Sequence, residues 1–107
     1  MQSTYDKIQW YHLGQKQKAN IAAKLKNLLA DEAKIQSAWL FGSFTRNESF
    51  RDIDVAIHAE PELSFKEYLD LNSRLELALG IPVDLVEIGK TPPSLREKIL
   101  ESGTQLR

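Results

Sequence analysis

The sequence predicts a single α/β (α+β) domain with a small mixed β-sheet packed by helices. Three observations lead to this class: a length of 107 residues, segments with helical periodicity, and short apolar or alternating segments between them. A length of about 100–150 residues is usual for one domain, and helices that alternate with strands commonly cover one sheet. We expect the order α-β-α-β-α-β-α in one unit, since no repeat or linker divides the chain.

The first half of the chain predicts a helix followed by a strand. Apolar residues from Ile21 to Leu29 recur at helical spacing with polar residues between them, which predicts a helix over residues 15–33. Residues 37–41 are a short, mainly apolar run that is typical of a buried strand. A Gly-Ser pair follows directly and predicts a turn into a short helical segment.

The second half predicts a strand, a helix, another strand and a last helix. Residues 52–58 alternate between apolar and mainly polar positions, as a half-buried strand does. Ser64 and Glu67 fit a capping box, and the helix that they open is expected to end at a left-handed glycine, Gly80. Residues 81–88 are nearly apolar on both faces, which we interpret as a strand in the interior of the sheet. Two prolines then open a helix over residues 94–101.

Composition excludes several classes of protein. The chain has no cysteine, which excludes thiol catalysis, disulfide frameworks and cysteine-type zinc sites. Lys and Arg number 14 against 15 Asp and Glu, so the net charge of −1 provides no overall basic field for nucleic acid. No apolar run approaches the ~20 residues of a membrane span, and the N-terminus has no signal-peptide core. We expect a cytoplasmic protein without a membrane or nucleic-acid partner.

An acidic pair on the first alternating strand is the main candidate for chemistry. Asp52 and Asp54 leave the same face of the strand, roughly 6–7 Å apart at the backbone. Two such carboxylates repel each other, and a hard cation such as Mg²⁺, which prefers oxygen ligands, would neutralise them. The alternative is a strand with a solvated acidic face.

A third carboxylate lies within an otherwise apolar strand. Asp84 is costly to bury there unless it is paired or bound to a metal ion. If its strand neighbours that of the acidic pair, three carboxylates converge on one place. The alternative for Asp84 is an ion pair with Arg46 or Arg51. Glu87 falls on the opposite face by alternation and is left out of the cluster.

A glycine-serine pair completes the candidate site. Gly42 and Ser43 follow a strand, ten residues before the acidic pair begins. Glycine allows a ligand to approach the backbone, and the following N–H groups and the serine hydroxyl can hold phosphate oxygens. A phosphate site that faces a metal site is what phosphoryl or nucleotidyl transfer requires.

These motifs together resemble a known family. Residues 40–57, Leu-Phe-Gly-Ser-Phe-Thr-Arg-Asn-Glu-Ser-Phe-Arg-Asp-Ile-Asp-Val-Ala-Ile, resemble the signature of the minimal nucleotidyltransferases of the DNA polymerase beta superfamily. Residues 82–86, Pro-Val-Asp-Leu-Val, resemble that family's third-carboxylate strand. Residues 92–103 are similar to the helix that closes its small prokaryotic members, so the resemblance covers about residues 36–107.

The resemblance implies a nucleotidyltransferase fold and assigns a role to each candidate residue. Gly42 and Ser43 would hold the triphosphate of ATP, and Arg46 would touch phosphate. Asp52 and Asp54 would bind two Mg²⁺ ions. Asp84 would complete one metal site and help to deprotonate the attacking hydroxyl, so the catalytic and metal-binding residues would be Asp52, Asp54 and Asp84.

The resemblance also implies a partner. Small members of the family often transfer AMP to a tyrosine of a HEPN-domain ribonuclease toxin, so this chain would be an antitoxin, in a homo- or hetero-oligomer. The alternative is a non-catalytic module that neutralises its partner by complex formation. The chain departs from the family pattern in three places: only eight residues separate Ser43 from Asp52, Asn47 replaces a frequent glycine, and Arg51 replaces a usual serine. The short loop and Arg51 motivate that alternative. A polymerase or tRNA-modifying enzyme fits less well without a basic surface, and a purely structural domain must explain all three acidic residues by ion pairs.

The remaining candidates are assigned to the surface or to a partner. Residues 1–14, with Trp10 and Tyr11, are expected to be an N-terminal segment that contacts a partner, and residues 15–107 the nucleotidyltransferase domain. His12 and His58 have no partner spacing typical of a triad or metal site. The remaining basic residues considered are expected to be solvated helix charges, with contact to a partner or to phosphate as the alternative: Lys66, Arg74, Lys90, Arg96 and Lys98.

Overall fold

The computed structural model of the protein describes residues 9–107, so the expectation for residues 1–8 lies outside the described residues. Helices and strands alternate along these residues in the predicted order, with three additional two-residue strands. The elements are β1 (Tyr11–His12), α1 (Gln15–Ala30), β2 (Ile35–Phe41), α2 (Ser43–Arg46), β3 (Ser49–Phe50), β4 (Ile53–Ala59), α3 (Phe65–Leu79), β5 (Val83–Glu87), the 3₁₀ turn η2 (Ile88–Lys90), α4 (Pro93–Ser102) and β6 (Thr104–Gln105).

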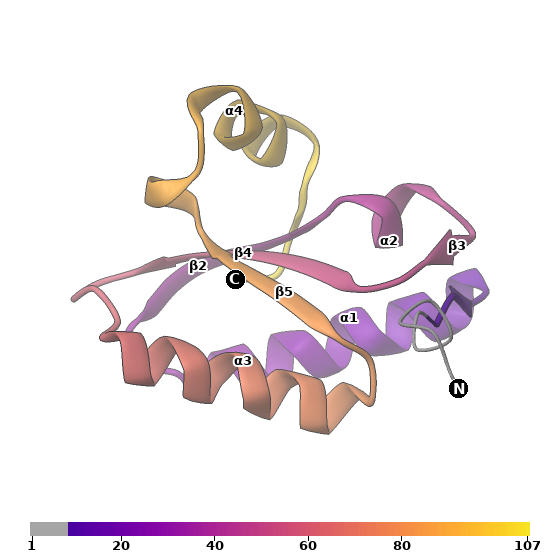
Figure 1. Ribbon diagram of the computed structural model, residues 1–107, viewed down its shortest axis with the longest axis horizontal. Helices are drawn as coiled ribbons and strands as arrows, with labels where there is room; N and C mark the ends of the chain where they lie inside the picture. The colour runs from indigo at the N-terminus through magenta and orange to yellow at the C-terminus, as the bar shows by residue number, and fades with distance from the viewer. Residues whose placement is uncertain (1–8) are drawn as a thin grey trace, which may run out of the picture.

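The sheet is mixed, as the sequence predicts. Its strand order is β5-β4-β2-β6, in which β2 pairs antiparallel with β4 and with β6, and β4 pairs parallel with β5. Helices α1 and α3 cover one face of the sheet and α4 lies on the other (Figure 1). In the part of the chain that the structure describes, no helix combines the length and apolar character needed to cross a membrane.

The two faces of the sheet bury cores of different size. Alternate residues of β4, among them Val55 and Ile57, pack with Leu25, Leu29 and Leu75 in the larger core beneath α1 and α3. The other face buries Ala56 with Ile88 and Ile99 in a smaller cluster beneath α4. Because side chains alternate along a strand, Asp54 belongs to the α4 face, two residues before Ala56.

The strand over residues 81–88 is an edge strand, so the prediction of an interior position is wrong. It is also shorter than predicted, because β5 spans Val83–Glu87 and Ile88 begins a 3₁₀ turn. Val83 and Leu85 are buried in the larger core and Val86 packs against the smaller cluster, so an edge strand can also carry apolar side chains on both faces, while Asp84 is exposed. The first helix also ends earlier than predicted, at Ala30, and β2 starts at Ile35.

The end of the N-terminal segment joins the domain through β1. Tyr11 is the register partner of Phe50 in β3, and their rings stack with centroids 5.8 Å apart. Trp10 is exposed, with the Arg51 guanidinium 5.7 Å from its ring centroid. His12 Nδ1 and Ser49 Oγ share a 2.9 Å hydrogen bond. His58 is exposed.

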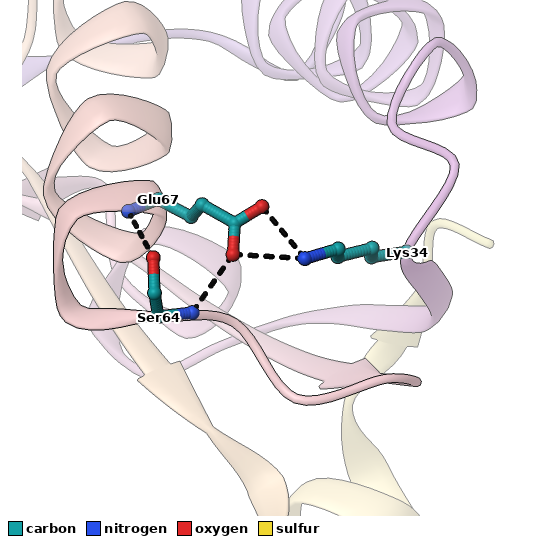
Figure 2. A network of polar contacts seen from close by, with 3 residues as sticks. All are labelled: Lys34, Ser64 and Glu67. Atoms are coloured by element: carbon teal, nitrogen blue, oxygen red, sulfur yellow. Dashed lines mark hydrogen bonds and ion pairs between the residues drawn. The ribbon is translucent and has the colours of Figure 1, made fainter.

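Helix α3 begins with the predicted capping box. The backbone N–H of Glu67 donates to Ser64 Oγ at 3.1 Å, and the backbone N–H of Ser64 donates to Glu67 Oε1 at 2.9 Å. Lys34 Nζ adds hydrogen bonds of 2.9 and 2.8 Å to the two carboxylate oxygens of Glu67 (Figure 2). The helix ends at Gly80 with φ 70°, which confirms the left-handed cap.

This network predicts an acidic titration of Glu67. The hydrogen bond from Lys34 and then that from the Ser64 N–H lower the pKa of Glu67 from 4.5 to about 2. Its contribution to stability is therefore complete above pH 4.5 and is lost as the pH falls from there through about 2. NMR titration of the Glu67 carboxyl carbon should show this pKa, and Lys34→Met should raise it more than Ser64→Ala does. An ordinary pKa in the unsubstituted protein would contradict the network.

Candidate active site

The three predicted carboxylates gather at the start of the parallel strand pair. Asp54 of β4 and Asp84 of β5 are direct register partners, and neighbouring strands lie about 4.8 Å apart. Asp52 directly precedes β4, two residues before Asp54. Asp54 and Asp84 therefore stand on the α4 face of the sheet as neighbours from strands that α3 separates in the sequence.

The charge of this group acts most strongly on Asp54. Burial first, and then the negative charges of Asp52 and Asp84, raise the pKa of Asp54 from 3.8 to about 7, while Arg46 opposes the shift. The carboxyl groups of Asp54 and Asp84 also lie close enough to share a hydrogen bond when one of them is protonated. Ionised carboxylates in this arrangement repel one another, and a cation would relieve the repulsion.

Ion pairing does not account for the acidic residues. Within residues 9–107, no ion pair involves Asp52, Asp54 or Asp84, and Arg51 lies against Trp10 instead. Over the same residues, no three His, Cys, Asp or Glu side chains are arranged as a group ready to hold a metal ion. The donors nevertheless fit a hard divalent cation in kind, because all three are carboxylates and none of them has an ion-pair partner among residues 9–107.

Gly42 is in contact with the acidic group. Its φ of 80° and ψ of −157° belong to a region that is essentially restricted to glycine. A Cβ atom at this position would lie 2.1 Å from Asp54 Oδ2. The sequence suggested that this glycine allows a ligand to approach the backbone, and the structure shows that it also makes room for Asp54.

Contacts with Phe50 and with Lys18 of α1 fix the position of helix α2. Ser43 and Arg46 of this helix lie shortly after Gly42 in the sequence. The buried Phe44 ring meets Phe50 edge-on, with centroids 5.0 Å apart. Lys18 of α1 lies 5.4 Å from the Phe44 ring centroid and donates a hydrogen bond to the backbone carbonyl at the end of α2. Ser43 is half-buried and Arg46 is exposed.

A recess between α2 and α4 adjoins the carboxylates. Its volume is about 250 Å³, and it is lined by Phe41, Gly42, Thr45, Arg46, Leu95, Lys98, Ile99 and Ser102. Lys98 was expected to be an ordinary solvated charge, so sequence reasoning missed its place here. One signal was available: Lys98 follows Leu95 by three residues and therefore flanks the apolar side of the helix.

The other basic candidates engage their own neighbours. Arg74 pairs with Glu32 at 2.5 Å, and Lys90 pairs with Glu62 and Glu87 at 2.6 and 2.7 Å. The Arg96 guanidinium donates hydrogen bonds to backbone carbonyls between η2 and α4. These partners occupy three of the five basic side chains but leave Lys98 without an ion pair among residues 9–107.

Comparison with known proteins gives similar sequences and folds. A relative from Methanocaldococcus jannaschii, named as a candidate protein adenylyltransferase, is 41% identical over 70 residues, which are 62% of this chain and 70% of the relative. Protein adenylyltransferase MntA of Shewanella oneidensis is 34% identical over 86 residues, which are 78% of this chain and 62% of that protein. The solved structure of a tri-AMPylated Shewanella oneidensis HEPN toxin in complex with MNT antitoxin aligns with a TM-score of 0.69 and 31% identity, covering 84% of this chain and 71% of that chain.

The family-level comparison agrees with the site. The polymerase beta nucleotidyltransferase family matches residues 23–107, which include all of the elements that carry the candidate site. The resemblance found in the sequence is thereby confirmed. Because this match covers most of its length, the chain belongs to the polymerase beta nucleotidyltransferase family.

Proposed function

We propose that the domain is a Mg²⁺-dependent nucleotidyltransferase that transfers AMP from ATP to a hydroxyl group of a partner protein. The observation that carries the proposal is the pairing of Asp54 with Asp84 across the two strands, with Gly42 against Asp54 and lining a recess that carries two basic side chains. The proposal includes a cytoplasmic location, since the reaction consumes ATP.

The reaction needs a phosphate site, a base and positive charge in one place. Gly42 and Ser43 would hold the triphosphate, and Arg46 would neutralise part of its charge. Mg²⁺, bound through Asp52, Asp54 and Asp84, would supply the charge that stabilises the attacked α-phosphate and the leaving pyrophosphate. The hydroxyl oxygen attacks the α-phosphorus, the bond to the β-phosphate breaks, and the hydroxyl proton passes to Asp84.

We propose a HEPN ribonuclease toxin as the acceptor protein, modified on a tyrosine, so that this chain acts as its antitoxin. The support is that a relative named protein adenylyltransferase comes from the same organism as the AMPylated HEPN toxin in the similar structure. The structure of the toxin with MNT antitoxin also offers a precedent for a contact between the two proteins. Residues 1–14, where Trp10 is exposed, would belong to the surface that meets the partner.

A second candidate is inhibition of the partner by binding alone. Exposed apolar side chains outside the site favour it, because such side chains often mark contact surfaces. Two of them, Phe65 and Leu69, lie within the first five residues of α3, with exposed fractions of 76% and 47%. A stable complex without covalent change would then be sufficient.

Intact mass spectrometry separates the two functions. A HEPN protein proposed as the acceptor is incubated with the purified domain, with and without Mg-ATP. Catalysis predicts a mass increase of one AMP per modified hydroxyl, dependent on Mg²⁺ and lost in Asp52→Asn. An unchanged mass in a stable complex would replace transfer by binding, and an equally active Asp52→Asn variant would refute the carboxylate site.

A further inference from the structure

The recess between α2 and α4 carries a basic side chain on each side. Arg46 stands on α2 and Lys98 on α4, and both line the same cavity of about 250 Å³. Neither of them forms an ion pair within residues 9–107. Two cations without an ion pair on either side of one hollow contribute positive potential there, which favours the anionic part of a ligand.

The position of the recess limits what this anion can be. Gly42 lines the recess and also contacts Asp54, so a ligand in the recess lies on the side of Gly42 that leads to the acidic group. Those carboxylates would repel an anion unless positive charge on its other side held it in place. The remaining lining is largely apolar, with Phe41, Leu95 and Ile99. Such a mixture suits a ligand with an anionic part and an apolar ring.

Helix α4 is fixed firmly enough to present a defined charge. Ile99 is almost completely buried on the sheet, and Leu95 packs against the same cluster. Lys98 is the residue before Ile99, and its side chain is exposed at the recess. A lysine on a fixed helix can place its ammonium group over phosphate as a point charge.

We propose that Lys98 is a nucleotide-binding residue that contacts the polyphosphate of a nucleoside triphosphate, across the recess from Arg46. This proposal rests on the proposed function and adds α4 to the site that the sequence confined to residues 42–84. In this proposal two elements bind the polyphosphate: α2 through its backbone and Arg46, and α4 through the charge of the Lys98 side chain. An acidic side chain of a partner protein is the other anion that could enter.

Calorimetric titration of the purified domain tests the assignment with defined ligands. ATP and adenosine are titrated separately in the presence of Mg²⁺ into the unsubstituted protein, Lys98→Ala and Lys98→Arg. Lys24→Ala is the matched control, because it removes the same charge from an exposed position on α1, beyond the opposite face of the sheet. Loss of one charge-assisted hydrogen bond corresponds to about a 10-fold weaker affinity.

The expected pattern is specific to phosphate. Lys98→Ala should weaken the affinity for ATP about 10-fold and leave the affinity for adenosine unchanged. Lys98→Arg should recover most of the lost affinity for ATP. Lys24→Ala should match the unsubstituted protein for both ligands. Equal losses for ATP and adenosine would show a packing effect, and an unchanged ATP affinity would assign the charge to another anion; either result overturns the proposal. If ATP binding depends on Lys98 but no AMP reaches the partner, the binding assignment stands and the proposed function fails.

Discussion

Replacing Gly42 by alanine is expected to reduce nucleotidyl transfer by about 100-fold or more. The added Cβ would lie 2.1 Å from Asp54 Oδ2, so the carboxylate, the backbone of α2 or both must move. A displacement of about 1 Å at a reacting centre can cost about 100-fold in rate. The substitution also places alanine at φ 80° and ψ −157°, where strain costs about 1–3 kcal/mol of stability.

Substitutions at two other glycines distinguish the effect of backbone strain from the effect of the Cβ contact with Asp54. Gly80 has a φ of 70° but nothing within 4 Å of an added Cβ, so Gly80→Ala tests left-handed strain alone. Gly89 lacks both the positive φ and the contact, so Gly89→Ala should be close to neutral. We expect Gly80→Ala to lose about 1–2 kcal/mol and keep its activity. Transfer rates and urea unfolding of the three variants would check this order, and a fully active Gly42→Ala would show that the contact with Asp54 has no role.

Replacing Asp54 by asparagine should remove activity and stabilise the metal-free protein. Under the proposed function, loss of a carboxylate that would bind Mg²⁺ removes several kcal/mol of charge stabilisation in the transition state, which corresponds to about a 10³-fold slower reaction. In the folded, metal-free protein the same carboxylate is unfavourable, because burial, Asp52 and Asp84 raise its pKa to about 7. The introduced amide carries no charge and can donate a hydrogen bond to Asp84.

The gain in stability has a defined pH dependence. Below pH 3.8 Asp54 is protonated in both the folded and unfolded states, so its raised pKa has no effect on stability. As the pH rises from about 4 to 7, the unfolded state releases this proton more readily, and the unsubstituted protein is progressively destabilised. Above pH 7 we expect Asp54→Asn to be more stable by about 1–2 kcal/mol, after allowance for solvent screening.

Thermal unfolding without metal, measured from pH 4 to 8, tests this prediction together with the transfer assay. A gain of about 1–2 kcal/mol corresponds to roughly 4–16 °C in melting temperature for a domain of this size. Glu97→Gln is the control, because Glu97 is exposed on α4 and has no ion pair within residues 9–107. A variant that loses both activity and stability would indicate that Asp54 is structural.

Strand alternation made the carboxylate cluster predictable. The spacing of Asp52 and Asp54 fixes their face, and a helix between two strands favours parallel neighbours. The sequence left the convergence of Asp84 with the acidic pair conditional on the two strands being neighbours, and the register of the strands shows that Asp54 and Asp84 are partners. The capping box at Ser64 was predictable for a similar reason, because it depends on residues three apart in the chain.

Contacts between distant elements were not predictable in this way. The approach of Gly42 to Asp54 depends on how β2 pairs with β4, which local patterns do not specify. The place of Lys98 depends on where α4 crosses the sheet, and a residue that flanks an apolar stripe can turn toward either side. The two-residue strands β1, β3 and β6 are too short to show any periodicity.

The edge position of β5 gives α3 an influence on the geometry of the candidate site. An edge strand is paired on one side only, and a slip of one residue would turn Asp84 to the opposite face and replace it by an apolar neighbour. Two side chains of α3 oppose such a slip: Glu76 accepts a 2.8 Å hydrogen bond from the Val83 N–H, and Tyr68 donates one to the Leu85 carbonyl. These bonds hold the backbone on both sides of Asp84, so a helix on the far face of the sheet sets the alignment of the third carboxylate.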